Sequence, residues 1–171
     1  LRKLQSAPPP KPLSGHVVLL AGADRDHGSQ VAVRLAADGA HLVLLGKDAG
    51  RLEEVQAALP AGVATVAGSD PVSDAILAFG GVDVVVALEP IETSLLERVT
   101  TGMRKQGLNG VLVGVGSDKE TTIPAGSSSE LARRNYVATA ADADSAMVAE
   151  AVAFLASSRS GTTSGVTLPV G

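Results

Sequence analysis

The feature that most constrains the fold is an apolar run that leads directly into a loop bounded by glycines. Residues 17–21 read Val-Val-Leu-Leu-Ala, and Gly22 and Gly28 bound the loop that follows. Residues 29–38 then have the spacing of an amphipathic helix that ends at Gly39. Glycines at a strand-to-helix turn let a phosphate group approach the backbone N–H groups of the helix. This stretch predicts the first strand and helix of a nucleotide-binding α/β fold.

Apolar strands and helices continue to alternate along the rest of the chain. Further strands are expected at 41–45, 63–67, 82–88, 111–115, 135–138 and 165–170. Further helices are expected at 50–59, 70–79, 92–106 and 143–157, with a polar loop at 117–129. Strands that are apolar throughout indicate a parallel sheet covered on both faces. The predicted fold is a shortened Rossmann-type doubly wound parallel sheet, three-layer α/β/α.

Composition limits the partners and the setting of the chain. The 171 residues carry a formal net charge of −4 and only 2% aromatic residues, which argues against nucleic acid and an anionic membrane surface as partners. The absence of cysteine excludes disulfides and thiol nucleophiles. No apolar run approaches the roughly 20 residues that span a bilayer, and we expect a cytoplasmic protein. Residues 1–14 include four prolines and are expected to link the domain at 15–171 to a preceding part of a longer protein.

Several stretches outside the loop carry a recognisable pattern. They are residues 11–20, 35–43, 68–70, 81–86, 153–157 and 168–171. With the loop at 21–28, they resemble the short-chain dehydrogenase/reductase family over residues 13–171. Residues 103–112 and the proline linker are similar, more narrowly, to the reductase half of bifunctional class II aldolase/short-chain dehydrogenase proteins of the rhamnulose-phosphate type. These resemblances imply the strand order 3-2-1-4-5-6-7, a fused aldolase-like domain and a homo-oligomer formed through the C-terminal helix and strand, 143–170.

The chain departs from that family where the family performs chemistry. The middle glycine of its T-G-x-x-x-G-x-G loop is Asp26, and its N-N-A-G segment reads Ala-Leu-Glu-Pro at 87–90. Its Tyr-x-x-x-Lys pair has no counterpart, because Tyr136 is followed four residues later by Ala140. Without that lysine, an unperturbed phenol with a pKa of about 10 is a poor proton donor at neutral pH.

Asp26 admits three interpretations. Its carboxylate would repel a phosphate about 4 Å away by on the order of 1 kcal/mol in water and about 4 kcal/mol at an effective dielectric constant of about 20. The favoured interpretation is that Asp26 caps the helix, accepting the N–H groups that a phosphate would use. Weak residual nucleotide binding and a repurposed site are the alternatives.

Three other residues are candidates for a cofactor or catalytic role. Gly46 and Lys47 follow the second strand. A lysine at this position would favour NADP by pairing with the 2′-phosphate of that cofactor. A solvated lysine explains the pattern equally well. Asp70 matches the family's adenine-contacting aspartate but also fits a plain turn and helix start. Ser117 matches the family's catalytic serine, yet by itself it moves no proton, so a polar loop residue is favoured. Asp118 or Glu89 are conceivable substitute acids.

The loop also contains side chains that could ligate a metal. Asp24, Asp26 and His27 have loose spacing and no identifiable further ligand, so a solvated loop is favoured and no metal is expected. His16 and His41 are expected to be ordinary residues at the starts of strands.

The leading functional hypothesis is a catalytically degenerate domain that serves as a scaffold or oligomerisation module, with no cofactor or only weak NADP binding. One alternative is an NADP-dependent oxidoreductase of small hydroxyaldehyde or sugar-derived carbonyl substrates. Another is a nucleotide-binding sensor without turnover.

Overall fold

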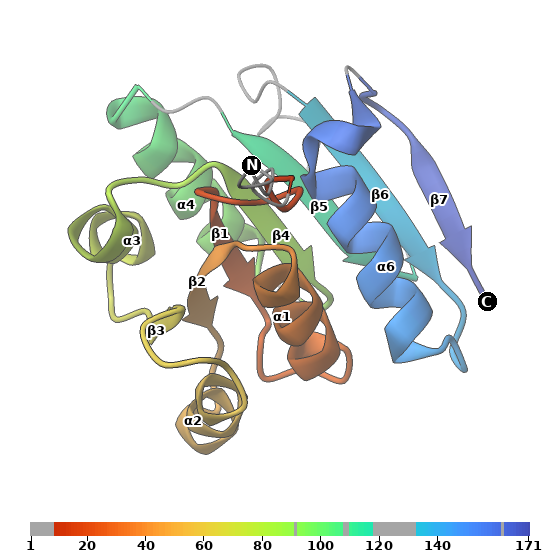
Figure 1. Cartoon of the computed structure of the whole chain (residues 1–171), viewed down its shortest axis with the longest axis horizontal. Helices are drawn as coiled ribbons and strands as arrows, with labels where there is room; N and C mark the ends of the chain where they lie inside the picture. The colour runs from red at the N-terminus through yellow and green to blue at the C-terminus, as the bar shows by residue number, and fades with distance from the viewer. Residues whose placement is uncertain (1–8, 91, 108–109, 118–132, 162) are drawn as a thin grey trace, which may run out of the picture.

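The computed structural model describes residues 9–90, 92–107, 110–117, 133–161 and 163–171. Within them the strands form one seven-stranded sheet in the order β3-β2-β1-β4-β5-β6-β7, and all neighbouring pairs are parallel (Figure 1). The strands are β1 (Val17–Ala21), β2 (His41–Leu45), β3 (Ala64–Val66), β4 (Val84–Leu88), β5 (Val111–Gly116), β6 (Arg133–Thr139) and β7 (Thr167–Val170). The predicted Rossmann-type sheet and its strand order are confirmed.

The helices lie between the strands as the sequence predicts. They are α1 (Gly28–Ala37), α2 (Ala49–Ala57), α3 (Pro71–Phe79), α4 (Thr93–Lys105) and α6 (Ser145–Ala156), followed by a short 3₁₀ turn at Ser158–Ser160. Each of these helices and strands begins and ends within two residues of its predicted bounds. The polar loop predicted at 117–129 lies, beyond its first residue, outside the described residues. No helix in the described ranges is long and apolar enough to cross a membrane.

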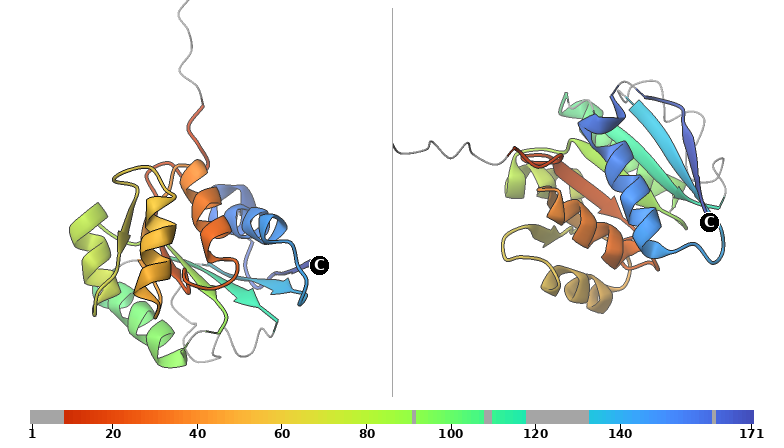
Figure 2. Two further views of the ribbon diagram at one scale, coloured as in Figure 1. Left: turned by 90° about the horizontal axis from the view of Figure 1, so that it is seen from below. Right: turned by 45° about the vertical axis from the view of Figure 1, so that its right-hand side comes forward.

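The sheet has an apolar layer on each face. Alternate residues of the central strands point to opposite faces, so Val18 and Leu20 of β1 join α1, α2 and α6, whereas Val17 and Leu19 join α3 and α4. Figure 2 shows these two sets of helices on opposite sides of the sheet. Burial of alternating apolar side chains against both helix layers explains why the strands are apolar throughout.

Aspartates mark the starts of three helices. Asp48 accepts the N–H of Arg51 at the start of α2, and Asp70 accepts the N–H of Ser73 at the start of α3. Asp144 does the same for α6. A carboxylate at this position satisfies N–H groups that the helix leaves without partners and interacts favourably with the helix dipole.

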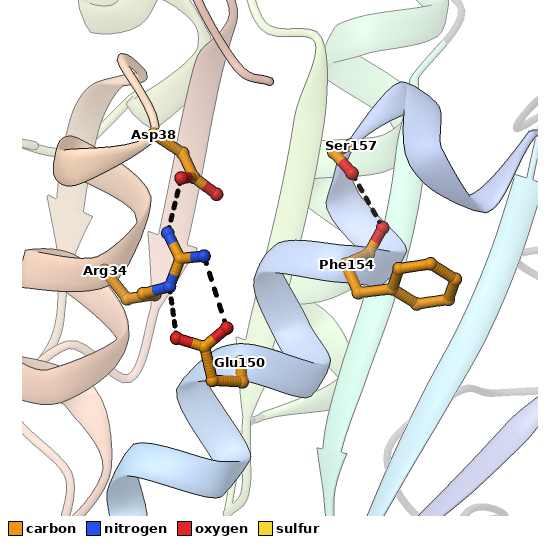
Figure 3. Close-up of polar contacts among 5 residues, drawn as sticks. All are labelled: Arg34, Asp38, Glu150, Phe154 and Ser157. Carbon is orange, nitrogen blue, oxygen red and sulfur yellow. Dashed lines mark hydrogen bonds and ion pairs between the residues drawn. The ribbon is translucent and has the colours of Figure 1, made fainter. Parts of the chain in front are cut away.

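The helices α1 and α6 pack side by side over the sheet and are joined by an ion pair. Arg34 of α1 donates from Nε to Oε1 of Glu150 at 2.5 Å and from Nη2 to Oε2 at 3.2 Å (Figure 3). Arg34 also pairs with Asp38. These bonds raise the pKa of Arg34, and the bond with Arg34 lowers the pKa of Glu150. This partly exposed ion pair links α1 to α6.

Candidate functional site

The loop between β1 and α1 lies at the carboxyl edge of the sheet, where the strand order reverses between β1 and β4. Gly22 has a φ of +82°, and a Cβ there would lie 2.8 Å from the carbonyl oxygen of Leu88. Its N–H donates to the carbonyl of Leu45 at 2.7 Å. At Gly28 a side chain would collide with the backbone of Ala23. The tight turn therefore requires both glycines that bound the loop.

The helix α1 begins without a side-chain cap, which contradicts the expectation for Asp26. The N-cap residue is His27, which makes no cap hydrogen bond; its Nδ1 instead lies 2.8 Å from Oγ of Ser145. The Asp26 side chain is exposed, and in the described part of the chain it accepts no N–H of α1. The capping interpretation is therefore wrong, because the carboxylate lies beside the helix end without binding it. Among the described residues no side chain accepts the first N–H groups of α1, and the N–H of Gly28 donates to the carbonyl of Arg25 at 2.9 Å.

A different loop carboxylate, that of Asp24, is bound internally. Asp24 is 7% exposed, and its Oδ2 accepts the N–H groups of Lys47 at 2.9 Å and Asp48 at 3.0 Å. Burial alone would raise the pKa of Asp24, but the hydrogen bonds from Asp48 and Lys47 outweigh it and the pKa is lowered. A Cβ at Gly46 would collide with this carboxylate. Asp24 thus joins the glycine loop to the turn between β2 and α2.

Lys47, the residue expected to favour NADP, turns its side chain toward α4. Its Nζ pairs with Glu92, and both side chains are largely exposed. This hydrogen bond lowers the pKa of Glu92. The ammonium group is therefore already engaged by a carboxylate.

On the other side of the strand-order reversal, Glu89 follows β4 and reaches across to β5 and β6. Its Oε2 accepts the N–H of Ser117 at 2.9 Å, and the hydroxyl of Tyr136 lies 3.4 Å from its Oε1. A side chain at Gly116 would collide with the Glu89 carboxylate. The structure thus brings Glu89 and the backbone of Ser117 together, and it places the tyrosine of β6, 1% exposed, beneath them.

A cavity of about 660 Å³ lies in front of α1 and joins the two sides of the site. Arg25, Asp26 and Arg51 border it from the first half of the sheet, and Glu89 and Ser117 border it from the second. Ligands of open α/β sheets bind at this place, beyond the carboxyl ends of the strands at a reversal of strand order. Arg25 and Arg51 were not singled out from the sequence, because only the fold brings them to the loop.

The remaining sequence candidates do not join this cavity. Asp70 caps α3 through the N–H and hydroxyl of Ser73, and these bonds lower its pKa. Its plain role as a helix start is the one the structure shows. No group of three or more His, Asp or Glu residues in the described ranges could hold a metal ion. Asp118 lies outside the described residues.

Comparison with known proteins gives similarity at the level of structure. No protein-family model matches the sequence, and no curated protein matches it. The fold is similar to a short-chain type dehydrogenase/reductase from Mycobacterium marinum, with a TM-score of 0.72, 16% identity, and coverage of 94% of this chain and 95% of that one. It is also similar to the citronellol catabolism dehydrogenase AtuB of Pseudomonas aeruginosa PAO1, with a TM-score of 0.72, 19% identity and the same coverage.

A third similar structure is a short-chain dehydrogenase/reductase from Serratia marcescens BCRC 10948. It has a TM-score of 0.66, 21% identity, and coverage of 92% of this chain and 97% of that one. At such identities the likeness establishes the fold, which is that of the short-chain dehydrogenases/reductases. The narrower similarity to aldolase fusion proteins stays a prediction.

The two halves of the site differ in how they fit the cofactor that this fold commonly holds. The N–H groups of α1 and the nearby guanidinium groups of Arg25 and Arg51 suit a diphosphate. On the other half, the carboxylate of Glu89 projects over Gly116, and the Tyr136 hydroxyl is directed at that carboxylate. The residues therefore fit the phosphates of a nucleotide, and they do not form the family's proton-donating pair.

Proposed function

We propose that this chain is a nucleotide-binding domain with the short-chain dehydrogenase/reductase fold, which holds the diphosphate of an NAD(P)-type nucleotide and lacks the family's Tyr–Lys hydride-transfer chemistry. The observation that carries the proposal is the N-terminus of α1, which has no side-chain cap and opens on the cavity bordered by Arg25 and Arg51. Of the hypotheses drawn from the sequence, this proposal is nearest to a nucleotide-binding sensor without turnover.

Phosphate binding at this position has a direct physical basis. The unsatisfied N–H groups of a helix N-terminus and the positive end of its dipole attract anions. Arg25 and Arg51 add two cations at the edge of the same cavity, while exposed Asp26 opposes them. We therefore expect binding of modest strength, with a dissociation constant on the order of 0.1 mM, or about −5.5 kcal/mol.

The arrangement of Tyr136 supports binding without the family's chemistry. The Tyr136 side chain is 1% exposed and its hydroxyl is directed at Glu89. Ala140, four residues later, supplies no ammonium group to lower a phenol pKa. No lysine is among the described residues that border the cavity.

Isothermal titration with ADP and NADH tests the proposal on the full chain. We expect both nucleotides to bind, and Arg51→Ala to weaken both by about fivefold to tenfold through loss of one phosphate contact. Arg98→Ala is the matched control, since Arg98 borders a separate cavity between α3 and α4. No heat change with either nucleotide at millimolar concentration would overturn the proposal. Steady oxidation of NADPH with lactaldehyde would instead favour the oxidoreductase alternative.

A scaffold role has a separate observation in its favour. On α6, Met147 is 53% exposed and Phe154 is 43% exposed, and Phe154 lies on the side of the helix away from Arg34 of α1 (Figure 3). Exposed apolar side chains beside an edge strand such as β7 are typical of association surfaces. We propose that two copies of the chain associate through α6 and β7.

Sedimentation velocity at several concentrations tests this association. We expect a dimer that the double substitution Met147→Glu and Phe154→Glu converts to a monomer, because two buried apolar contacts would become charged. Val33→Glu, on the exposed side of α1, is the control and leaves the dimer intact. A monomer at all concentrations in the unmodified chain would refute the association.

A further inference from the structure

We infer that Glu89 makes the site selective for the oxidation state of its nucleotide: the oxidised, positively charged nicotinamide ring binds more tightly than the neutral reduced ring. The inference rests on the proposed function, because it concerns the far end of the same NAD(P)-type nucleotide. It assigns a role in ligand choice to a carboxylate that the sequence offered only as a substitute acid.

The position of Glu89 at the sheet edge carries the first step. A dinucleotide that binds at a reversal of strand order lies across the crevice, with one nucleotide in front of each half of the sheet. The N-terminus of α1, Arg25 and Arg51 belong to the half that begins with β1 and suit the diphosphate. Glu89 follows β4 and borders the same cavity from the other half. The second nucleotide, with its ring, would therefore enter the half that contains Glu89.

The surroundings of Glu89 carry the second step. Leu88, Pro90 and Val115 border this half of the cavity, and Leu88 and Val115 are each 2% exposed. Apolar walls with a few polar groups are typical of sites that hold flat organic rings. A carboxylate beside such walls interacts more strongly with a charge than a carboxylate in open water does. This half of the cavity thus offers a ring apolar contact and one negative charge.

The charge of Glu89 carries the third step, because no cation of the described residues neutralises it. Glu89 forms no ion pair within the described ranges. Its described partners are neutral: the N–H of Ser117 at 2.9 Å and the hydroxyl of Tyr136, 3.4 Å from its Oε1. A carboxylate has about four acceptor positions, so two such contacts leave acceptor capacity for a ligand. A cationic ring would compensate this charge, whereas a neutral ring would not.

Isothermal titration of the full chain with ADP, NAD⁺ and NADH tests the inference. NAD⁺ and NADH share their adenosine and diphosphate, so the ratio of their dissociation constants reports the ring. We expect NAD⁺ to bind about threefold to tenfold more tightly than NADH. Equal or tighter binding of NADH, with ADP still bound, would overturn the inference and leave the proposed function intact. Failure of all three to bind would overturn the proposed function, and the inference with it.

Three variants separate the charge of Glu89 from its hydrogen bonds. Glu89→Gln keeps an oxygen for the N–H of Ser117 but removes the charge, so the two forms should bind within about twofold of each other and ADP should bind as before. Glu89→Asp keeps the charge and should retain the preference for NAD⁺. Glu97→Gln is the matched control, because this exposed carboxylate borders the separate cavity between α3 and α4 and should leave the ratio unchanged. Thermal unfolding of each variant confirms that it is folded, and an unchanged ratio in Glu89→Gln would contradict the inference.

Discussion

At the carboxyl edge of the sheet, the end of β2 and the end of β5 share one arrangement: a carboxylate from another strand end occupies the space beside a glycine. Directly after β2, Gly46 lacks a side chain and the carboxylate of Asp24 fills the space. At the last residue of β5, Gly116 lacks a side chain and the carboxylate of Glu89 fills the space. In both places the carboxylate accepts the N–H of the residue that follows the glycine. Internal carboxylates thus satisfy backbone donors at strand ends where a ligand commonly binds.

The difference between the two sides lies in how firmly each carboxylate is held. The carboxylate of Asp24 is buried, accepts two N–H groups and is carried on a short side chain. Glu89 is half-buried, accepts one N–H group and a more distant hydroxyl, and borders the large cavity. The comparison indicates a fixed carboxylate on the β2 side and a displaceable one on the β5 side.

Adding a methyl group at each glycine gives the largest effect. Gly46→Ala should lower the free energy of unfolding by about 2–4 kcal/mol, because Asp24 must leave its two donors to make room. Gly116→Ala should cost about 1 kcal/mol, because the longer Glu89 side chain can turn into the cavity. Urea unfolding of both variants measures the difference, and equal costs would contradict the comparison.

A double substitution checks the cause of that difference. Asp24→Ala together with Gly46→Ala should cost at least 1 kcal/mol less than the sum of the two single changes, roughly the coupling seen for residues in contact. Additive costs would mean that the Asp24 carboxylate is not what the new methyl group meets.

Removing the charges should give a smaller effect. Asp24→Asn should destabilise the chain by about 1–2 kcal/mol. The amide oxygen can still accept the N–H groups of Lys47 and Asp48, but these hydrogen bonds lose the strengthening that the negative charge gives them. Glu89→Gln should change stability by less than about 0.5 kcal/mol, because solvent in the cavity compensates it. Thermal unfolding near pH 7 measures both, and a greater loss in Glu89→Gln would reverse the assignment of fixed and displaceable carboxylates.

The pH dependence of stability should show the weakest contrast. The pKa of Asp24 is lowered from its ordinary value of 3.8, so its stabilising contribution is fully present above that value and is lost as the pH falls through the lower pKa of the folded state. Asp24→Asn should therefore flatten the decline of stability below about pH 4. Glu89→Gln provides the reference, and an unchanged slope in Asp24→Asn would contradict the role of its ionised form.

The sequence predicted the frame of the molecule more fully than its site. The bounds of β1 and β2 follow from apolar runs and turn residues, because burial on two faces leaves a plain local pattern. The order of the seven strands was predicted from the family resemblance, because no local pattern encodes it. The glycines at 22 and 28 could be predicted to bound the loop, but the contacts that require Gly22, with Leu45 and Leu88, come only with the fold. The bounds of the strands depend on neighbours in the chain.

The roles of the carboxylates could not be read in the same way. Asp24 contacts residues that lie 23 and 24 positions further along, and Glu89 contacts a residue 28 positions away. Aspartate is a residue type that commonly caps helices, but Asp26 lies one residue ahead of the N-cap residue His27, and its side chain does not bind the helix. The signal that could have revealed both internal carboxylates was a glycine at the end of β2 and another at the end of β5.

The attachment of α1 to α6 has a consequence for how the molecule responds to its surroundings. His27 contacts Ser145 at one end of the helix pair, and Arg34 grips Glu150 further along. These contacts connect the end of the glycine loop to α6, which also carries the exposed Met147 and Phe154. For the proposed dimer and the proposed nucleotide, thermodynamic reciprocity requires that any factor by which self-association changes the affinity for the nucleotide is the factor by which the nucleotide changes self-association.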